Sequence, residues 1–148
     1  MKRAISLAKE AAELGEVPVG AVVVCGDEII SEAFNRRETD RNALAHAELS
    51  AMRDACETLG GWRLQNCELF VTLEPCPMCA GAAINSRISR VVYGAKDPKA
   101  GALGSLVNLV RYPFNHHPEI VSGVLADESA ELLRSFFLSL RSKRGKKA

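Results

Sequence analysis

The sequence lacks any apolar run that approaches the ~20 residues of a membrane-spanning helix, so we expect no membrane segment. It also lacks the apolar core of a secretory signal, because charged and polar residues recur from Lys2 through Glu13. Charge of one sign is not in excess either: 19 Lys and Arg stand against 18 Asp and Glu, a net charge of +1. The first expectation is a reduced, cytoplasmic protein that does not depend on bulk attraction to phosphate.

Aromatic residues are scarce, at 5% of the chain, but the hydrophobic share of 47% and the charged share of 25% are ordinary. These values exclude collagen-like, low-complexity and intrinsically disordered proteins. A length of 148 residues suits one domain, and no repeat, linker or composition break divides it. We therefore expect a single domain over residues 1–148.

The basic residues are distributed unevenly along the chain. Positions 141–148 hold five basic residues and no acid, whereas residues 1–140 carry 14 basic and 18 acidic groups, a net charge of −4. The near-neutral net charge is therefore the sum of an acidic segment, residues 1–140, and a basic tail at 141–148. A frayed, solvated end is the simplest interpretation of this tail, and a phosphate contact is the alternative if the substrate is a nucleic acid.

Helical and strand patterns alternate along the chain and predict an α/β fold. The Gly26-Asp27 pair predicts a hairpin between the first two strands, and strand–helix–strand units favour parallel pairing later. The whole order predicts a three-layer α/β/α domain with a mixed five-stranded sheet. Helices are expected over 2–14, 43–59, 78–86 and from 127 onward, with a helical turn near 105–110 in a long loop. Strands are expected over 17–25, 28–34, 68–73, 89–94 and 119–125.

Two of the five cysteines form the strongest chemical signal, Pro75-Cys76-Pro77-Met78-Cys79. Thiolates at positions i and i+3 of a helix start lie on one face, and the positive end of the helix favours their ionised form. This spacing suits zinc, but the pair supplies only two ligands, and no second CxxC is present.

His46, in His46-Ala47-Glu48, offers the third ligand. One imidazole and two thiolates leave a fourth tetrahedral position for water, which is the mark of a catalytic zinc site. Glu48 can then move the proton of that water to a substrate. Residues i and i+2 lie about 200° apart on a regular helix, so His46 and Glu48 serve one site only at an irregular helix start.

Simpler explanations exist for each of these features. A lone CxxC in a cytosolic α/β protein can be a redox pair or a structural site, although a thioredoxin-like redox pair would leave His46 and Glu48 without a role. His116-His117 lies between two prolines and is more typical of an exposed loop than of a metal site. Three further cysteines occupy apolar settings and are expected to be inert: Cys25, Cys56 and Cys67.

His46-x-Glu48 followed by Pro75-Cys76-x-x-Cys79 is the known signature of the zinc deaminases. Over nearly its whole length the sequence resembles the bacterial tRNA-specific adenosine deaminases of the cytidine deaminase-like superfamily. The segments 94–101 and 17–22 favour this tRNA branch over the rest of the superfamily. The matching stretches are residues 16–22, Asn35, 46–48, 71–82, 94–101 and 125–128.

The resemblance implies one Zn²⁺ per subunit on His46, Cys76 and Cys79, and conversion of adenosine to inosine at the wobble position of a tRNA anticodon. Zinc-bound hydroxide would attack C6 of adenine, and Glu48 would protonate the ring nitrogen and then the departing amine. It also implies a homodimer, with the anticodon stem-loop of tRNA as partner. A single-stranded anticodon loop lets one base be splayed into a pocket at low cost.

Further roles follow from the resemblance alone. Backbone groups around Ala47 and Pro75 would hold the reacting oxygen and amine. Phe137 would contact a nucleotide, although many relatives carry a basic residue where this chain has Leu138. The helical stripe around Phe137 is otherwise expected to be core or dimer contact. Substrate contacts are also implied for Asn35 on the nucleoside, Val19 and Leu73 on the base, and Asp97 and Lys99 on flanking nucleotides.

Two other functions remain open from the sequence. The same zinc chemistry could deaminate a free base, nucleoside or nucleotide of the cytidine or guanine type. A noncatalytic zinc-containing RNA-binding subunit is the alternative from another class, and the presence of Glu48 counts against it.

Overall fold

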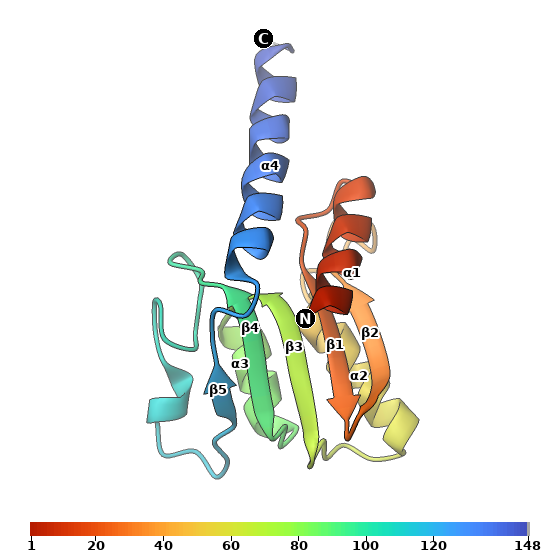
Figure 1. The fold of residues 1–148 in the computed structure, drawn as a ribbon, viewed down its shortest axis with the longest axis vertical. Coiled ribbons are helices and arrows are strands. Elements are labelled where there is room, and N and C mark those ends of the chain that lie inside the picture. Colours follow the sequence, from red (N-terminus) through yellow and green to blue (C-terminus); the bar gives the residue numbers. More distant parts are fainter. Residues whose placement is uncertain (148) are drawn as a thin grey trace.

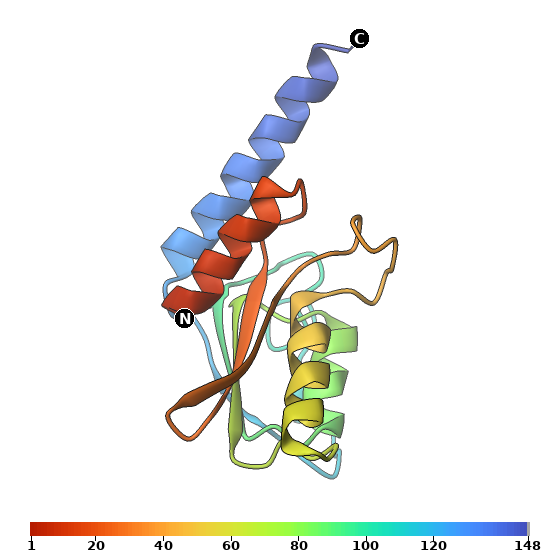
Figure 2. The same ribbon diagram turned by 90° about the vertical axis from the view of Figure 1, so that its right-hand side faces the viewer.

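A mixed sheet of five strands lies between two pairs of helices in the computed structural model, which describes residues 1–147. Helices α1 and α4 cover one face of the sheet, and α2 and α3 cover the other (Figures 1 and 2). The strands are β1 (Gly20–Cys25), β2 (Glu28–Phe34), β3 (Cys67–Leu73), β4 (Arg90–Ala95) and β5 (Glu119–Val121). The helices are α1 (Lys2–Glu13), α2 (Ala47–Leu59), α3 (Pro77–Asn85) and α4 (Ala126–Gly145), with a 3₁₀ turn, η1, at Leu109–Arg111.

The strand order is β2-β1-β3-β4-β5. Strand β1 is antiparallel to both of its neighbours, whereas β3, β4 and β5 are parallel to one another. The predicted three-layer α/β/α fold with a mixed five-stranded sheet is therefore confirmed, and so is the hairpin between the first two strands. In the part of the chain that the structure describes, no helix combines the length and the apolarity that a membrane crossing requires.

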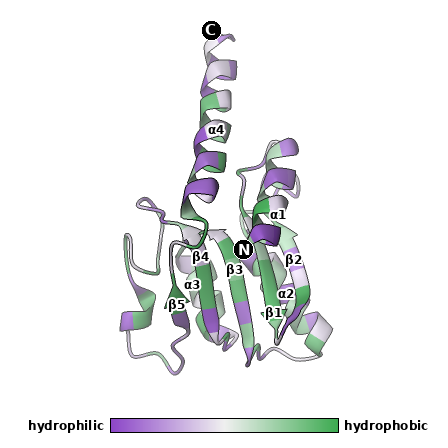
Figure 3. Ribbon diagram, in the orientation of Figure 1, coloured by the Kyte–Doolittle hydropathy of each residue, from purple (hydrophilic) through white to green (hydrophobic). Residues whose placement is uncertain are grey.

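The core lies mainly between the sheet and the α2–α3 layer. Strands β1, β3 and β4 supply long hydrophobic stretches (Figure 3), and Leu64, Leu69 and Ile88 are fully buried. On the other face of the sheet, the helices lie close to the strands instead of packing through large side chains. A Cβ at Gly20 would overlap the carbonyl oxygen of Ala4 in α1, and one at Gly94 would crowd Ser129 in α4. Both helices of this face therefore pack closely on strands that carry glycine at the contact.

Several expected boundaries differ from the observed ones. Strand β1 begins at Gly20 rather than at Val17, because Pro18 has no N–H and the Val19 N–H bonds the carbonyl of Val17. Helix α2 begins at Ala47 rather than at 43, because His46 is extended. Strand β5 ends at Val121 rather than at 125, and the expected turn at 105–110 lies at Leu109–Arg111.

Helix α4 continues through Gly145, so most of the expected basic tail is helical. It projects well beyond the sheet (Figures 1 and 2), and Ser129 is its one buried residue within the described chain. Of the two roles expected for its apolar stripe, core packing is not observed. Leu132, Leu133, Phe136 and Leu140 are half-buried, and Phe137 is exposed. Position 148 of the tail lies outside the described residues.

Candidate active site

Two helix starts meet at the candidate metal site. His46 is the extended residue that precedes α2, with φ −74° and ψ 146°, and Cys76 holds the same place before α3. Cys79 lies in the first turn of α3 and is fully buried. His46 Nδ1 lies 3.7 Å from Cys76 Sγ and 3.6 Å from Cys79 Sγ, and all three donor atoms lie within 4.8 Å of one another. The structure thus brings together three residues that are up to 33 positions apart in the sequence.

The donor set fits a tetrahedral zinc ion. With Zn–N near 2.1 Å and Zn–S near 2.3 Å, a tetrahedral ion holds N and S about 3.6 Å apart. This is the spacing from His46 Nδ1 to each sulfur. Among the described residues no other group of three His, Cys, Asp or Glu side chains is arranged in this way.

Glu48 lies in the first turn of α2, and the residue is 4% exposed. Because His46 is extended rather than helical, the angular separation of a regular helix does not apply to this pair. His46, Ala47 and Glu48 consequently line one cavity together with Cys76. The irregular helix start that a shared site requires is present.

The electrostatics of the site differ from those of an ordinary core. A hydrogen bond from the Cys79 thiol, together with His46, lowers the pKa of Cys76 to about 4, and the resulting thiolate raises the pKa of Cys79. The hydrogen bond with Cys76 also raises the pKa of His46. Burial raises the pKa of Glu48 to about 7. A carboxyl group with such a pKa takes up and releases protons readily at neutral pH.

Most of the expected substrate contacts line the same cavity: Val19, Asn35, Ala47, Leu73 and Asp97. The Asn35 side-chain amide is oriented by the protein, since its Nδ2 donates to the Val17 carbonyl and its Oδ1 accepts from the Arg37 N–H, both at 3.2 Å. Pro75 is not among the lining residues, and its carbonyl accepts a hydrogen bond from Ala102. Asp97 also forms the turn typical of Asp-Pro, accepting from the backbone N–H of Lys99 and Ala100.

Lys99 and Phe137 lie outside this cavity, in an adjoining groove between the 96–99 loop and α4. The groove and the cavity share Val17, Arg37, Leu73 and Asp97, so they form one continuous depression. The groove is strongly basic, with Asp97 as its single acidic lining residue. Its basic lining residues are Arg37, Lys96, Lys99, Arg134, Arg141 and Arg144.

Sequence reasoning missed four residues of the cavity: Val17, Arg37, Glu74 and Ala100. Glu74 is 2% exposed, and its carboxylate accepts backbone hydrogen bonds from Asp97, Leu103 and Ser105 and one from the Ser105 hydroxyl. It thereby fixes the loop after β4 beside the Cys76 turn. The sequence signal for Glu74 was its position immediately before Pro75 of the cysteine motif. The charged run 36–41, in contrast, gave no indication that Arg37 faces the site.

The remaining sequence candidates contact backbone groups or pack in the sheet. His116 and His117 each bond a backbone carbonyl through Nε2, those of Ile88 and Tyr112, and do not form a cluster. Cys67 is buried opposite Cys25 in the β1–β3 pair, and burial raises its pKa to about 12, so its thiol stays protonated.

A three-layer α/β/α fold with a His/Cys/Cys triangle and a buried carboxyl group at two helix starts defines a hydrolytic deaminase. The profile of the MafB19-like deaminase family matches residues 1–141. A tRNA-specific adenosine deaminase of Bacillus subtilis (strain 168) is 54% identical over 97% of this chain and 90% of its own. A solved structure from a study of A-to-I editing by tRNA:A34 deaminases at the wobble position is also similar. It has a TM-score of 0.88 and 46% identity over 90% of this chain and 97% of that chain.

A guanine deaminase structure from Bacillus subtilis is more distant, with a TM-score of 0.64 and 32% identity over 95% of this chain and 90% of that chain. This chain belongs to the tRNA-specific adenosine deaminases within the MafB19-like deaminase family. The resemblance inferred from the motifs is therefore confirmed.

Proposed function

We propose that this protein converts adenosine to inosine at the wobble position of a tRNA anticodon. The observation that carries this proposal is the continuity of the basic groove with the cavity that holds His46, Glu48 and Cys76. An RNA strand along the groove neutralises the lining cations and can place one unstacked base in the cavity. A free base would use the cavity and leave the groove without a role.

We propose that His46, Cys76 and Cys79 hold one zinc ion per subunit. When bound, zinc lowers the pKa of a coordinated water toward ~7 and so supplies a nucleophile at neutral pH. Glu48 accepts a proton from the attacking water as its oxygen bonds to C6 of the adenine. The same carboxyl group passes this proton to the ring nitrogen, then takes the second proton from the oxygen now bonded to C6 and passes it to the amine, so that the C6–N bond breaks and ammonia leaves. The buried position of Glu48 keeps its proton away from bulk solvent.

The walls of the cavity orient the base. Val19 and Leu73 offer apolar contacts to its faces, and Asn35, already oriented by Val17 and Arg37, has a free N–H and a free lone pair for the nucleoside. Phe137 is 42% exposed in the groove, where it can stack on a neighbouring base. Lys99, on the turn that Asp97 organises, is placed for a flanking phosphate.

The test is mass spectrometry of an anticodon stem-loop with adenosine at the wobble position. We expect the mass of the wobble nucleotide alone to increase, by the amount that replacement of an amino group by oxygen produces. Free cytidine, guanine and adenosine serve as alternative substrates in separate, parallel reactions. Turnover of a free base without turnover of the RNA would instead establish the guanine deaminase type of activity. Binding of the RNA without turnover by the zinc-loaded protein would point to a noncatalytic subunit.

We further propose that residues 1–148 act as one deaminase domain in a cytoplasmic homodimer, as the relationship to this family implies. Light scattering on the purified protein checks the dimer, since a monomeric mass at micromolar concentration would contradict it.

A further inference from the structure

The segment between β2 and α2 forms one rim of the active site without regular secondary structure. Residues 35–46 carry Asn35 and Arg37, which line the cavity, and end at His46. Such a loop needs contacts from outside itself to keep a defined shape. Backbone bonds close parts of it, such as Asp40 N–H to the Arg36 carbonyl and Arg36 N–H to the Ala45 carbonyl.

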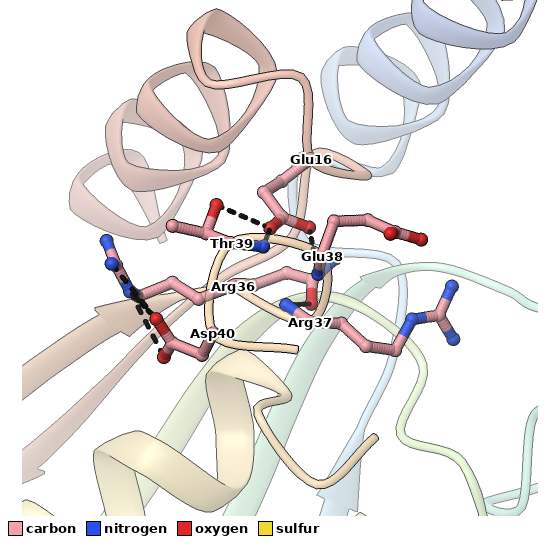
Figure 4. Close-up of polar contacts among 7 residues, drawn as sticks. Glu16, Arg36, Arg37, Glu38, Thr39 and Asp40 are labelled. Carbon is pink, nitrogen blue, oxygen red and sulfur yellow. Dashed lines mark hydrogen bonds and ion pairs between the residues drawn. The ribbon is translucent and has the colours of Figure 1, made fainter. Parts of the chain in front are cut away.

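Glu16, which lies between α1 and β1 and is 1% exposed, makes side-chain contacts to the middle of this loop. One carboxylate oxygen accepts from the Thr39 N–H at 2.6 Å and from the Thr39 hydroxyl at 2.7 Å, and the other accepts from the Glu38 N–H at 3.3 Å (Figure 4). Although burial alone would raise the pKa of Glu16, these hydrogen bonds lower it overall. The buried charge is therefore satisfied by the loop rather than by an ion pair.

Arg36 and Arg37 leave this loop in opposite directions (Figure 4). The Arg36 guanidinium pairs with Asp40 at 3.1 Å on the outer surface. Arg37 has no ion pair among residues 1–147, and its side chain lines both the cavity and the basic groove. An unpaired guanidinium at the junction of the two depressions suits a phosphate that enters with the reacting nucleotide.

We propose that Glu16 is a positioning residue for the RNA substrate: by holding Glu38 and Thr39 it directs Arg37 into the junction, where Arg37 binds a backbone phosphate. This inference rests on the proposed RNA substrate and assigns no part of the chemical step to Glu16. Its consequence is that Glu16 and Arg37 act on RNA binding as one unit, although neither touches the other directly.

A double-mutant cycle with Glu16→Gln and Arg37→Gln tests this. The amide of Gln keeps one acceptor oxygen for Thr39 but turns an NH₂ group toward the Glu38 N–H, next to Arg37. We expect each single variant to raise KM for the stem-loop about tenfold with kcat within about twofold. In the Arg37→Gln background, Glu16→Gln should add less than about twofold. Independent effects that multiply, or a fall in kcat rather than a rise in KM, would overturn the inference.

A second readout is the salt dependence of stem-loop binding, measured by fluorescence anisotropy. Removal of one cation that neutralises a phosphate of single-stranded RNA lowers the slope of log Kd against log salt by about 0.7. We expect this change for Arg37→Gln and a similar one for Glu16→Gln. Arg36→Gln is the matched control, since its guanidinium faces Asp40, and should leave both KM and the slope unchanged.

Zinc content and thermal melting show whether Glu16→Gln remains folded. If it does not, Thr39→Val replaces it in the cycle, because it removes one donor to Glu16 and keeps the side-chain shape. The expected rise in KM is then about threefold, again absent in the Arg37→Gln background. A wild-type protein that does not turn over the stem-loop refutes the proposed function. Turnover by the wild type with unchanged KM and slope in Arg37→Gln refutes only the present inference.

Discussion

The three metal-site residues together with Glu48, here called the cavity floor, and the adjoining groove are built from different kinds of structure. His46, Glu48, Cys76 and Cys79 lie in or just before the first turns of α2 and α3, which pack against the sheet. Arg37, Lys99 and Phe137 lie on two loops and on an exposed helix. The groups assigned to the chemical step are thus held by the core, whereas those assigned to RNA binding lie at the surface. Changes in the floor should act on turnover, and changes in the groove on affinity.

The largest effect is expected for Cys79→Ala, which removes a fully buried ligand. The metal should no longer bind stoichiometrically and deamination should fall below detection. Metal analysis and the inosine assay are the measurements. Cys67→Ala is the matched control, because Cys67 is equally buried but lies in the sheet away from the site, so zinc and turnover should be retained. A fully active Cys79→Ala protein would refute the ligand assignment.

The second largest effect is expected for Glu48→Gln, a fall in kcat of about 10³-fold, which is within the range of general acid–base catalysis. The amide fills the same space but cannot carry the proton, so zinc content and stem-loop affinity should stay near those of the wild type. Single-turnover kinetics at saturating RNA measure the change. Retention of most of the activity would mean that another group moves the proton.

Phe137→Ala should act on the groove alone. Removal of the ring that stacks on one base should raise KM about tenfold, with kcat unchanged. The neighbouring Leu138→Ala is the control, because Leu138 is 61% exposed and does not line the groove. An equal rise in KM in both variants would show that α4 acts through its helical stability rather than through the ring.

The smallest effect is expected for removal of residues 141–148. This deletes two lining cations, Arg141 and Arg144, and three further basic residues. Stem-loop affinity should weaken a few-fold, and its salt slope should fall by about 0.7 for each RNA phosphate that the tail no longer neutralises. If affinity and slope are both unchanged, the end of α4 is a solvated segment without a role in RNA binding.

The sequence carried more information about the floor than about the groove. His46, Glu48, Cys76 and Cys79 could be found because a metal site requires fixed residue types at fixed spacings from helix starts. The layers and strand pairing followed from periodicity and the Gly26-Asp27 turn. Sequence patterns could not show that Ala43 to Ala45, which suit a helix, lie in a loop, because contacts such as Arg36 N–H to the Ala45 carbonyl are made only in the fold.

The groove depends on how distant segments meet in space. Arg37, Lys99 and Arg144 lie far apart in the chain, and charge patterning within each segment does not reveal that they line one depression. Phe137 and Lys99 were found through family resemblance, whereas Arg37 and Glu16 were not. Glu16 falls within a stretch that matches the family, but its burial and its bonds to Thr39 are tertiary facts.

Helix α4 also fixes the spacing between residues that line the groove. Phe137, Arg141 and Arg144 are spaced by four and three residues on one uninterrupted helix, so they share a face that lines the groove. A rise of 1.5 Å per residue puts about 10 Å between Phe137 and Arg144 along the axis. If RNA binds in the groove as proposed, we expect the base stacked on Phe137 and the phosphate bound by Arg144 to be separated by about this length along the strand.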